Sequence, residues 1–128
     1  MSALTRLATA VAVFFVAAGP ALAEGDAAAG ERVFAKCKAC HTIEEGGPAR
    51  VGPNLYGVYG RQAGSNEDFA ARYSNGLKEA GFTWDDETLP AYLTNPREVI
   101  QGSRMAFQLR NEQEVVDVIA YLRSQGGE

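Results

Sequence analysis

Both cysteines and the single histidine of the chain stand together, as Cys37-Lys38-Ala39-Cys40-His41. A C-x-x-C-H run is typical of covalent attachment of a c-type haem. The two intervening residues place both thiols along one edge of a flat ring, where they would form thioethers with the vinyl groups. The histidine that follows can then reach beneath the ring to the iron. We therefore predict one haem c, attached through Cys37 and Cys40, with His41 as an iron ligand.

Three other uses of this stretch fit the sequence less well. A thioredoxin-like redox pair has the same C-x-x-C spacing, but it requires a βαβ pattern, and no convincing strand lies near the motif. A structural zinc site needs about four cysteine or histidine ligands, and the chain offers three. A plain disulfide would leave His41 without a role. Haem attachment is the interpretation that uses all three residues.

The other axial ligand of the iron has one main candidate. Apart from Met1, the chain has a single methionine, Met105, in a loop between two expected helices. A thioether suits low-spin haem iron, and His/Met ligation raises the reduction potential. The alternative is that Met105 fills the core, as methionines commonly do. The sequence also permits ligation by tyrosine or lysine, or a sixth coordination position with no protein ligand. A free sixth position would favour ligand binding or peroxidase-like chemistry.

The first 23 residues have the pattern of a secretory signal peptide. Arg6 provides a positive start, an apolar run follows from residue 7 to 18, and Ala21-Leu22-Ala23 fits a small-x-small cleavage site. The rival interpretation is an uncleaved membrane anchor, but the apolar run is shorter than the roughly 20 residues that a spanning helix needs. We expect export to the periplasm and one domain over residues 24–128.

The domain is predicted to be all-α, with about four to five helices and long loops. Asp26 caps a first helix that runs to the haem motif, and residues 42–66 are punctuated by glycine and proline and indicate a loop. Gly30, in the middle of that helix, suggests close packing against another helix. The remaining helical segments are expected after caps at Ser74, Asp85 or Asp86, Asn95 and Asn111, the last with Glu114 in a capping box.

Charge and size limit the classes of partner. The chain has 128 residues, a formal net charge of −4 and no basic run. Nucleic acid is therefore not an expected partner. A domain of this size has a thin hydrophobic core, to which a large apolar ring would contribute. We expect a monomer with no stable membrane insertion.

With these residues assembled, the sequence closely resembles the small class I cytochromes c, of the mitochondrial cytochrome c and bacterial cytochrome c2 branches. The likeness spans residues 24–124 and rests on motifs that share order and spacing. These motifs are Gly30-Glu31-Arg32-Val33-Phe34, Cys37-Lys38-Ala39-Cys40-His41-Thr42, Val51-Gly52-Pro53-Asn54-Leu55, Tyr73, Thr83-Trp84, Tyr92-Leu93-Thr94-Asn95-Pro96, Gly102-Ser103-Arg104-Met105-Ala106-Phe107 and Ile119-Ala120-Tyr121-Leu122.

The resemblance implies roles for further residues. His41 and Met105 would be the axial ligands, and the Pro53 carbonyl would accept a hydrogen bond from the far nitrogen of His41. The remaining pocket residues would be Tyr92 near the methionine sulfur, and Tyr73, Trp84 and Arg61 at a haem propionate. Without the family resemblance, ordinary core packing would be the preferred interpretation of each aromatic residue. Gly30 would let the first helix cross the last one closely.

The family also implies a function. The protein would be an electron carrier and not an enzyme, passing one electron between a quinol-oxidising cytochrome complex and a photosynthetic reaction centre or terminal oxidase. The alternative within electron transfer is a dedicated acceptor of one periplasmic dehydrogenase. Transient redox partners would dock over the haem edge, on a basic face formed by Lys36, Lys38, Arg97 and Arg104; a scattered basic surface is the alternative.

Two departures from the family affect the site. Gln101 stands where many relatives have a proline before the Gly-x-x-Met turn, so the ligand loop is expected to be less rigid. Leu77 replaces a buried asparagine of mitochondrial relatives, which changes the polar network near the ring.

Overall fold

The computed structural model describes residues 9–15 and 24–126. The predicted cleavage site after Ala23 lies outside these residues. Five α-helices and one 3-10 helix form, and the described part of the chain has no strand beyond one isolated bridge between Gln62 and Thr83. The elements are α1 (Ala27–Phe34), η1 (Glu67–Arg72), α2 (Asn75–Lys78), α3 (Thr88–Thr94), α4 (Pro96–Val99) and α5 (Glu112–Ser124). The all-α prediction is confirmed.

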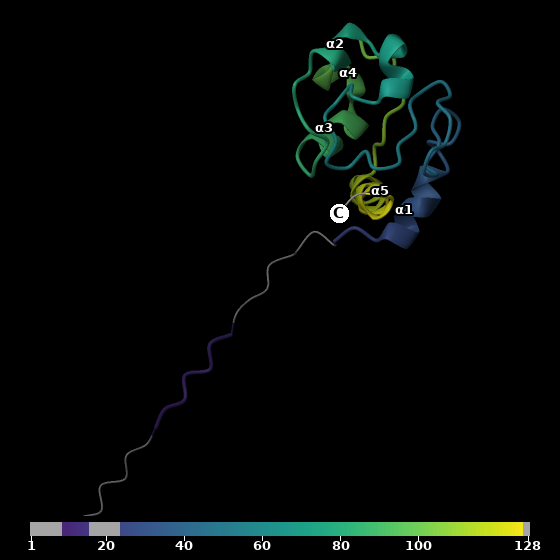
Figure 1. Ribbon diagram of the computed structural model, residues 1–128. Helices are drawn as coiled ribbons and strands as arrows, with labels where there is room; N and C mark the ends of the chain where they lie inside the picture. Colours follow the sequence, from purple (N-terminus) through teal and green to yellow (C-terminus); the bar gives the residue numbers. More distant parts are fainter. Residues whose placement is uncertain (1–8, 16–23, 127–128) are drawn as a thin grey trace, which may run out of the picture.

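Helices α1 and α5 pack side by side and form one side of the domain (Figure 1). They approach closely at Gly30, where a Cβ atom would lie 1.9 Å from the Asp117 carbonyl oxygen. The Asp117 side chain, buried at the crossing, accepts a hydrogen bond of 2.9 Å from the Asp26 amide at the start of α1. The Phe34 and Tyr121 rings lie beside it with centroids 5.4 Å apart. The prediction that Gly30 permits a close crossing is confirmed.

Helix α5 begins where the sequence predicts. The Asn111 side chain accepts hydrogen bonds from the amides of Gln113 and Glu114. The expected capping box does not form among the described residues, because both Glu114 carboxylate oxygens bind the Lys36 ammonium, at 2.8 and 3.0 Å. That contact ties the start of α5 to the turn after α1. Beyond the helix, Gly126 has the left-handed φ of 76° that favours glycine.

Helix α3 begins later than the position of its predicted cap suggests. The Asp85 carboxylate accepts hydrogen bonds from the amides of Glu87 and Thr88, and the helix starts at Thr88. Pro90 therefore falls in the first helical turn, where N–H groups have no intrahelical acceptor. Its missing N–H thus costs the helix no hydrogen bond. Asn95 then stands at the cap of α4, but its side chain makes no capping bond there.

The Asp85 carboxylate gives the protein a predictable dependence on pH. Its hydrogen bonds to the Thr88 and Glu87 amides lower its pKa below the usual carboxyl value. A carboxyl group whose pKa is lower in the folded state stabilises the fold at pH values above its ordinary pKa. This stabilisation is lost as the pH falls through the lowered pKa. Asp85→Ala is therefore expected to lower the melting temperature at pH 7, with a gap that narrows below about pH 4.

Melting curves of both proteins between pH 7 and 3 check this expectation. Glu87→Ala is the matched control, because it removes the same charge two residues away and no side-chain hydrogen bond of Glu87 is found in the described structure. A melting difference for Asp85→Ala that stays constant over the pH range would contradict the assignment.

Residues 42–66 form the long loop that the sequence predicts, and it meets the end of α5, where the Gly57 amide donates to the Gln125 carbonyl at 2.8 Å. The short helix η1 that follows was not predicted. Its cap is Asn66, whose side chain accepts a hydrogen bond from the Asp68 amide. Ser74 caps α2 as expected, by accepting from the Leu77 amide. Among the described residues, no helix has the length and apolar character needed to cross a membrane.

Candidate haem site

The helices and loops enclose a cavity of about 620 Å³. This volume is within the range of roughly 300–1,000 Å³ of small-molecule sites. Its walls are mainly apolar side chains, including Phe34, Leu55, Leu89, Leu93, Val118 and Leu122. The charged side chains that line it are all cationic, and they are Lys36, Arg61, Arg72 and Arg104. The cavity therefore suits a large apolar group that carries negative charge at its edge.

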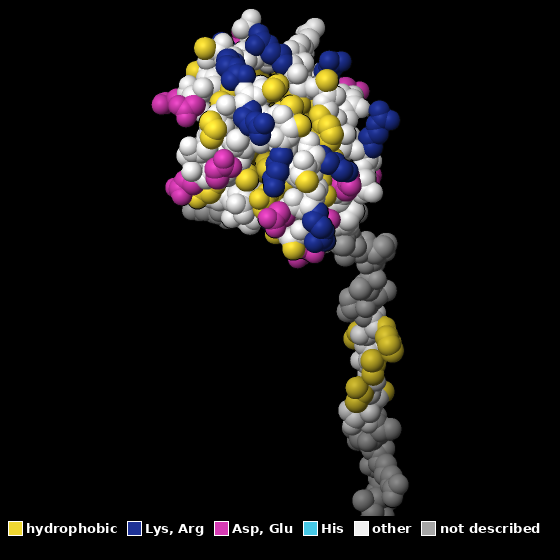
Figure 2. All heavy atoms as spheres, turned by 90° about the vertical axis from the view of Figure 1, so that its right-hand side faces the viewer, with side chains coloured by type: hydrophobic (Ala, Val, Ile, Leu, Met, Phe, Trp, Pro, Cys, Tyr) yellow, Lys and Arg dark blue, Asp and Glu magenta, His cyan; other side chains and the backbone are white. Residues whose placement is uncertain are grey.

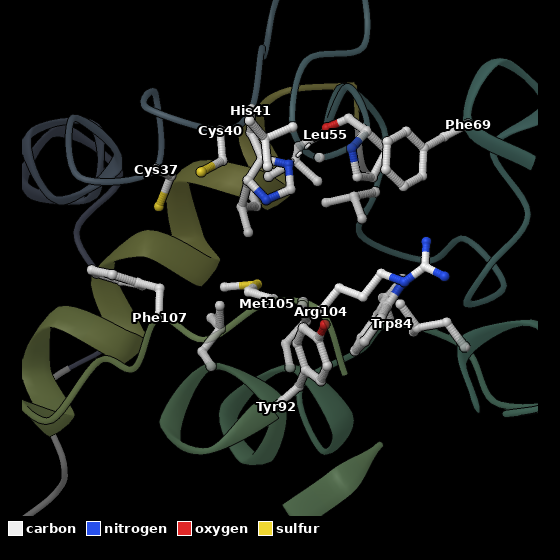
Figure 3. A pocket seen from close by; sticks show the side chains of 18 of the residues that line it. Cys37, Cys40, His41, Leu55, Phe69, Trp84, Tyr92, Arg104, Met105 and Phe107 are labelled. Atoms are coloured by element: carbon white, nitrogen blue, oxygen red, sulfur yellow. Dashed lines mark hydrogen bonds between the residues drawn. The ribbon is translucent and has the colours of Figure 1, made fainter. Parts of the chain in front are cut away.

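The C-x-x-C-H stretch continues the chain of α1 as a series of turns. The Cys37 amide donates to the Phe34 carbonyl, and the amides of Cys40 and His41 both donate to the Cys37 carbonyl, at 3.1 and 2.9 Å. This winding brings the two sulfur atoms and the imidazole to one side of the cavity (Figure 3). Cys37 and Cys40 form no disulfide with each other. Burial, with the neighbouring Cys40, raises the pKa of the Cys37 thiol to about 11.

The His41 ring is held by the loop that follows the motif. Its Nδ1 lies 2.7 Å from the Pro53 carbonyl oxygen. Because a carbonyl can only accept, Nδ1 carries the proton and Nε2 keeps a free lone pair. Gly52 packs against the ring, and a Cβ atom on it would lie 2.3 Å from His41 Cε1. Burial lowers the pKa of His41 despite the Pro53 bond, so the imidazole stays neutral, as a metal ligand must be.

Met105 lies on the wall opposite His41, and the two side chains face each other across the cavity (Figure 3). Its position depends on Ser103, whose buried hydroxyl accepts from the Met105 amide at 3.3 Å. The Tyr92 hydroxyl lies 3.4 Å from the same Ser103 oxygen. Burial raises the pKa of Tyr92, so its phenol stays protonated at neutral pH. Ser103 was not singled out in the sequence, although a hydroxyl two residues before the methionine is a signal for such a turn.

The other predicted site residues also line this cavity: Cys37, Cys40, Pro53, Arg61, Tyr73, Trp84 and Tyr92. The Arg61 guanidinium donates to the carbonyls of Asn54 and Tyr56. The Tyr73 hydroxyl accepts from the Asn66 amide at 3.2 Å. These bonds fix a cation and a phenol at the same part of the wall.

The aromatic wall continues from Trp84, whose ring lies 4.8 Å from that of Tyr92 and 5.0 Å from that of Phe82. Leu77 also lines the cavity, so the departure from the family makes this wall more apolar. Gln101 is exposed, and its carbonyl oxygen packs against Gly76, where a Cβ atom would approach it to 2.7 Å.

These donors fit a haem c. Two thiols and a neutral imidazole lie on one side, a thioether lies on the other, and the walls between them are apolar. Among the described residues, no cluster of three or more histidine, cysteine, aspartate or glutamate side chains could hold a metal ion directly. A macrocycle that supplies four of the iron ligands would need only the two axial groups that this cavity offers.

An all-α fold around such a cavity, with C-x-x-C-H on one wall, is that of a class I c-type cytochrome. A family model described as cytochrome c matches residues 27–126, and the chain belongs to the cytochrome c family. Members of this family are electron carriers and not enzymes, and the family carries covalently bound haem c. The resemblance stated from the sequence is confirmed.

Relatives support the assignment over most of the chain. Cytochrome c2 of Rhodospirillum rubrum is 44% identical over 117 residues, which cover 84% of this chain and 87% of the relative. Cytochrome c-554 of Methylosinus trichosporium is 40% identical over 130 residues, which cover 100% of this chain and 97% of the relative. The solved structure of cytochrome cH from Methylobacterium extorquens is 43% identical, with a TM-score of 0.68 over 78% of this chain and 99% of that one.

Proposed function

We propose that this protein is a periplasmic carrier of one electron, with a single haem c attached through Cys37 and Cys40. His41 and Met105 are the axial ligands of its iron. The observation that carries this proposal is the placement of His41 and Met105 on opposite walls of one cavity, with both cysteines on the histidine side. With both axial positions filled by the protein, the metal has no place for a substrate, which suits electron transfer and not catalysis.

The bound haem supplies an iron that alternates between two oxidation states. The chain keeps its ligands in place in both. Pro53 and Gly52 hold the His41 ring, and Ser103 holds the main chain of Met105. The apolar walls exclude water, which favours the less charged state of the site and raises the potential together with the methionine.

Polar groups along the wall serve the carboxylates of the ring. Arg61, Tyr73 and Trp84 are the residues that we assign to a propionate. Burial lowers the pKa of the Arg61 guanidinium, but a guanidinium remains protonated at any physiological pH. A partly buried cation that makes no ion pair among the described residues is suited to a carboxylate of the cofactor.

Partners would approach the mouth of the cavity, where Lys36, Arg72 and Arg104 lie beside the exposed side chains of Val51 and Phe107. Figure 2 shows lysine and arginine side chains interspersed with hydrophobic ones on one face of the molecule, with acidic side chains on the same face. Such a surface fits an acidic partner that docks transiently. We assign these partners to a quinol-oxidising cytochrome complex as donor and a reaction centre or terminal oxidase as acceptor.

The docking surface predicts an effect of charge reversal. Lys38 is exposed and stands between two cysteines that line the cavity, whereas Arg97 is exposed on α4; neither side chain lines the cavity itself. Lys38→Glu is expected to slow the second-order electron transfer to an acidic partner at least several-fold at low salt, and Arg97→Glu much less. Stopped-flow rates at rising ionic strength check this, because both variants should approach the wild-type rate when charges are screened. Equal slowing by both variants would indicate a scattered basic surface.

Export of the chain is part of the same proposal. Residues 1–23 act as a signal peptide that is cleaved after Ala23. In support, the apolar side chains of Val11, Phe14 and Phe15 are 81%, 89% and 93% exposed and contribute nothing to the core. N-terminal sequencing of the exported protein should then read from Glu24; a chain that begins at Met1 would overturn the cleavage.

The proposed function is tested by challenging the haem-loaded protein with external ligands. We expect the reduced protein to resist carbon monoxide and the oxidised protein to take up cyanide slowly, with a methionine-to-iron charge-transfer band present at neutral pH. Rapid uptake of either ligand, with no such band, would contradict the electron-carrier proposal and indicate a haem protein with an open sixth position.

A further inference from the structure

Three arginines form a chain of hydrogen bonds around the mouth of the cavity. Arg104 Nη1 donates to the Arg72 carbonyl at 2.9 Å, and Arg72 Nη2 donates to the Arg50 carbonyl. Arg50 Nη1 donates to the Lys38 carbonyl at 3.3 Å. We call Arg104, Arg72 and Arg50 the arginine relay. It joins the Met105 loop, the end of η1, the loop before Val51 and the C-x-x-C-H turn, which are far apart in sequence.

The central member of the relay is fixed by a contact besides its hydrogen bonds. The Arg72 guanidinium lies over the Phe69 ring, 4.6 Å from its centroid. Phe69 is buried, lines the cavity and packs edge-on against Tyr73 at 5.0 Å. A cation over an aromatic face gains electrostatic attraction and loses freedom of rotation. Arg72 is thereby a fixed link between the two outer arginines.

The Met105 loop depends on side chains for its position. From residue 104 to 108, within the described structure, no main-chain group bonds to another main-chain group. The inner anchor of this segment is Ser103, which holds the Met105 amide. The outer anchor is Arg104, which extends from beside Met105 toward the side of the cavity where Phe69 lies (Figure 3). Upstream, position 101 is glutamine and not a proline, which would stiffen the turn.

We propose that the arginine relay positions Met105, by closing a ring of hydrogen bonds from the methionine loop back to the motif that holds His41. This inference rests on the proposed function, because it assumes that Met105 is an axial ligand. Arg104 acts on Met105 as its neighbour in sequence. Arg72 and Arg50 act only through the relay, so their side chains should influence Met105 although both lie outside its loop.

The test is the rate at which imidazole replaces the Met105 thioether in the oxidised, haem-loaded protein. At high imidazole concentration this rate levels off at the rate of methionine release. Because a net hydrogen bond changes an equilibrium by roughly threefold to tenfold, Arg104→Gln and Arg72→Gln are each expected to raise the limiting rate by about that factor. Faster amide exchange at Met105, measured by NMR, should accompany the change and does not depend on electron-transfer activity.

Two further variants separate the relay from charge and from misfolding. Arg104→Lys keeps a donor that can reach the Arg72 carbonyl, so it should stay closer to the wild-type rate than Arg104→Gln. Arg110→Gln removes an exposed arginine with no side-chain hydrogen bond in the described structure, and should leave the rate unchanged. Both are expected to keep the wild-type visible spectrum, as are the glutamine variants.

The outcomes distinguish this inference from the function on which it rests. If imidazole uptake by the wild type levels off and both glutamine variants match it, the relay is overturned and Met105 remains a ligand. If uptake by the wild type never levels off and no charge-transfer band is present, Met105 is not a ligand and both proposals fail. An effect of Arg110→Gln as large as that of the two other glutamine variants would also overturn the relay, because charge alone would then explain the rates.

Discussion

Met105→Ala is expected to open the sixth coordination position and to lower the reduction potential by tenths of a volt. The potential should fall because the variant loses a thioether, which favours the reduced iron. Exchange of axial ligands changes the reduction potential over a range of about 0.8 V across haem proteins. The reduced variant should bind carbon monoxide rapidly, and the oxidised variant should lose the methionine-to-iron band. Potentiometric titration and spectra with added ligand measure both effects.

Gln101→Ala is the matched control for this variant. It shortens a side chain in the same loop, but Gln101 is exposed and does not line the cavity. Its spectrum and potential should stay close to those of the wild type. An unchanged spectrum for Met105→Ala would refute the ligand assignment, and with it the six-coordinate carrier.

Gly30→Ala is expected to lower the free energy of unfolding by about 2 kcal/mol or more. The added Cβ atom would lie 1.9 Å from the Asp117 carbonyl oxygen, which belongs to the main chain of α5 and cannot rotate away. Overpacking costs about 1–3 kcal/mol, occasionally more, and a clash with main chain falls at or above the upper end of that range. A gain of about 1 kcal/mol in helix propensity then leaves a net loss of about 2 kcal/mol or more. Denaturant unfolding of the haem-loaded protein measures the net change in the free energy of unfolding.

Arg32→Ala supplies the comparison on the same helix. Arg32 is exposed on α1, so its replacement should change stability by no more than about 0.5 kcal/mol. A Gly30→Ala protein as stable as the wild type would mean that α1 and α5 can separate at little cost, and that their crossing does not hold the domain together.

Local signals in the sequence predicted much of the fold. The caps at Asp26, Ser74 and Asn111 form as expected, because each depends on a side chain and an amide two or three residues away. The stop before Pro96 is equally local, since the residue before proline disfavours the helical conformation. Gly30 was interpretable for a different reason: a glycine inside a helix costs stability and needs a packing partner to explain it.

Features that depend on distant partners were not predictable in this way. Glu114 occupies the capping-box position, yet it binds Lys36, a residue 78 positions away. The short helix η1 has no hydrophobic period, and only its cap residue, Asn66, gives a local signal. The start of α3 was placed too early because the Asp85 turn precedes the helix.

The same division holds within the candidate site. Cys37, Cys40 and His41 form a motif with a fixed spacing, and Met105 follows by counting the remaining methionines. Arg72 carries no such signal, because its role arises only when separate loops meet at the cavity. Ser103 gives only a weak local signal, a hydroxyl two residues before the methionine.

The central claim, that Met105 is an axial ligand opposite His41, is tested most directly by proton NMR of the reduced, haem-loaded protein. A methyl group held over the face of the ring experiences its ring current and is shifted far upfield. Because the proposed cleavage after Ala23 would leave Met105 as the one methionine, we predict a single three-proton methionine resonance well upfield of the ordinary methyl range, absent from Met105→Ala. A methionine methyl signal at its ordinary position would contradict the account.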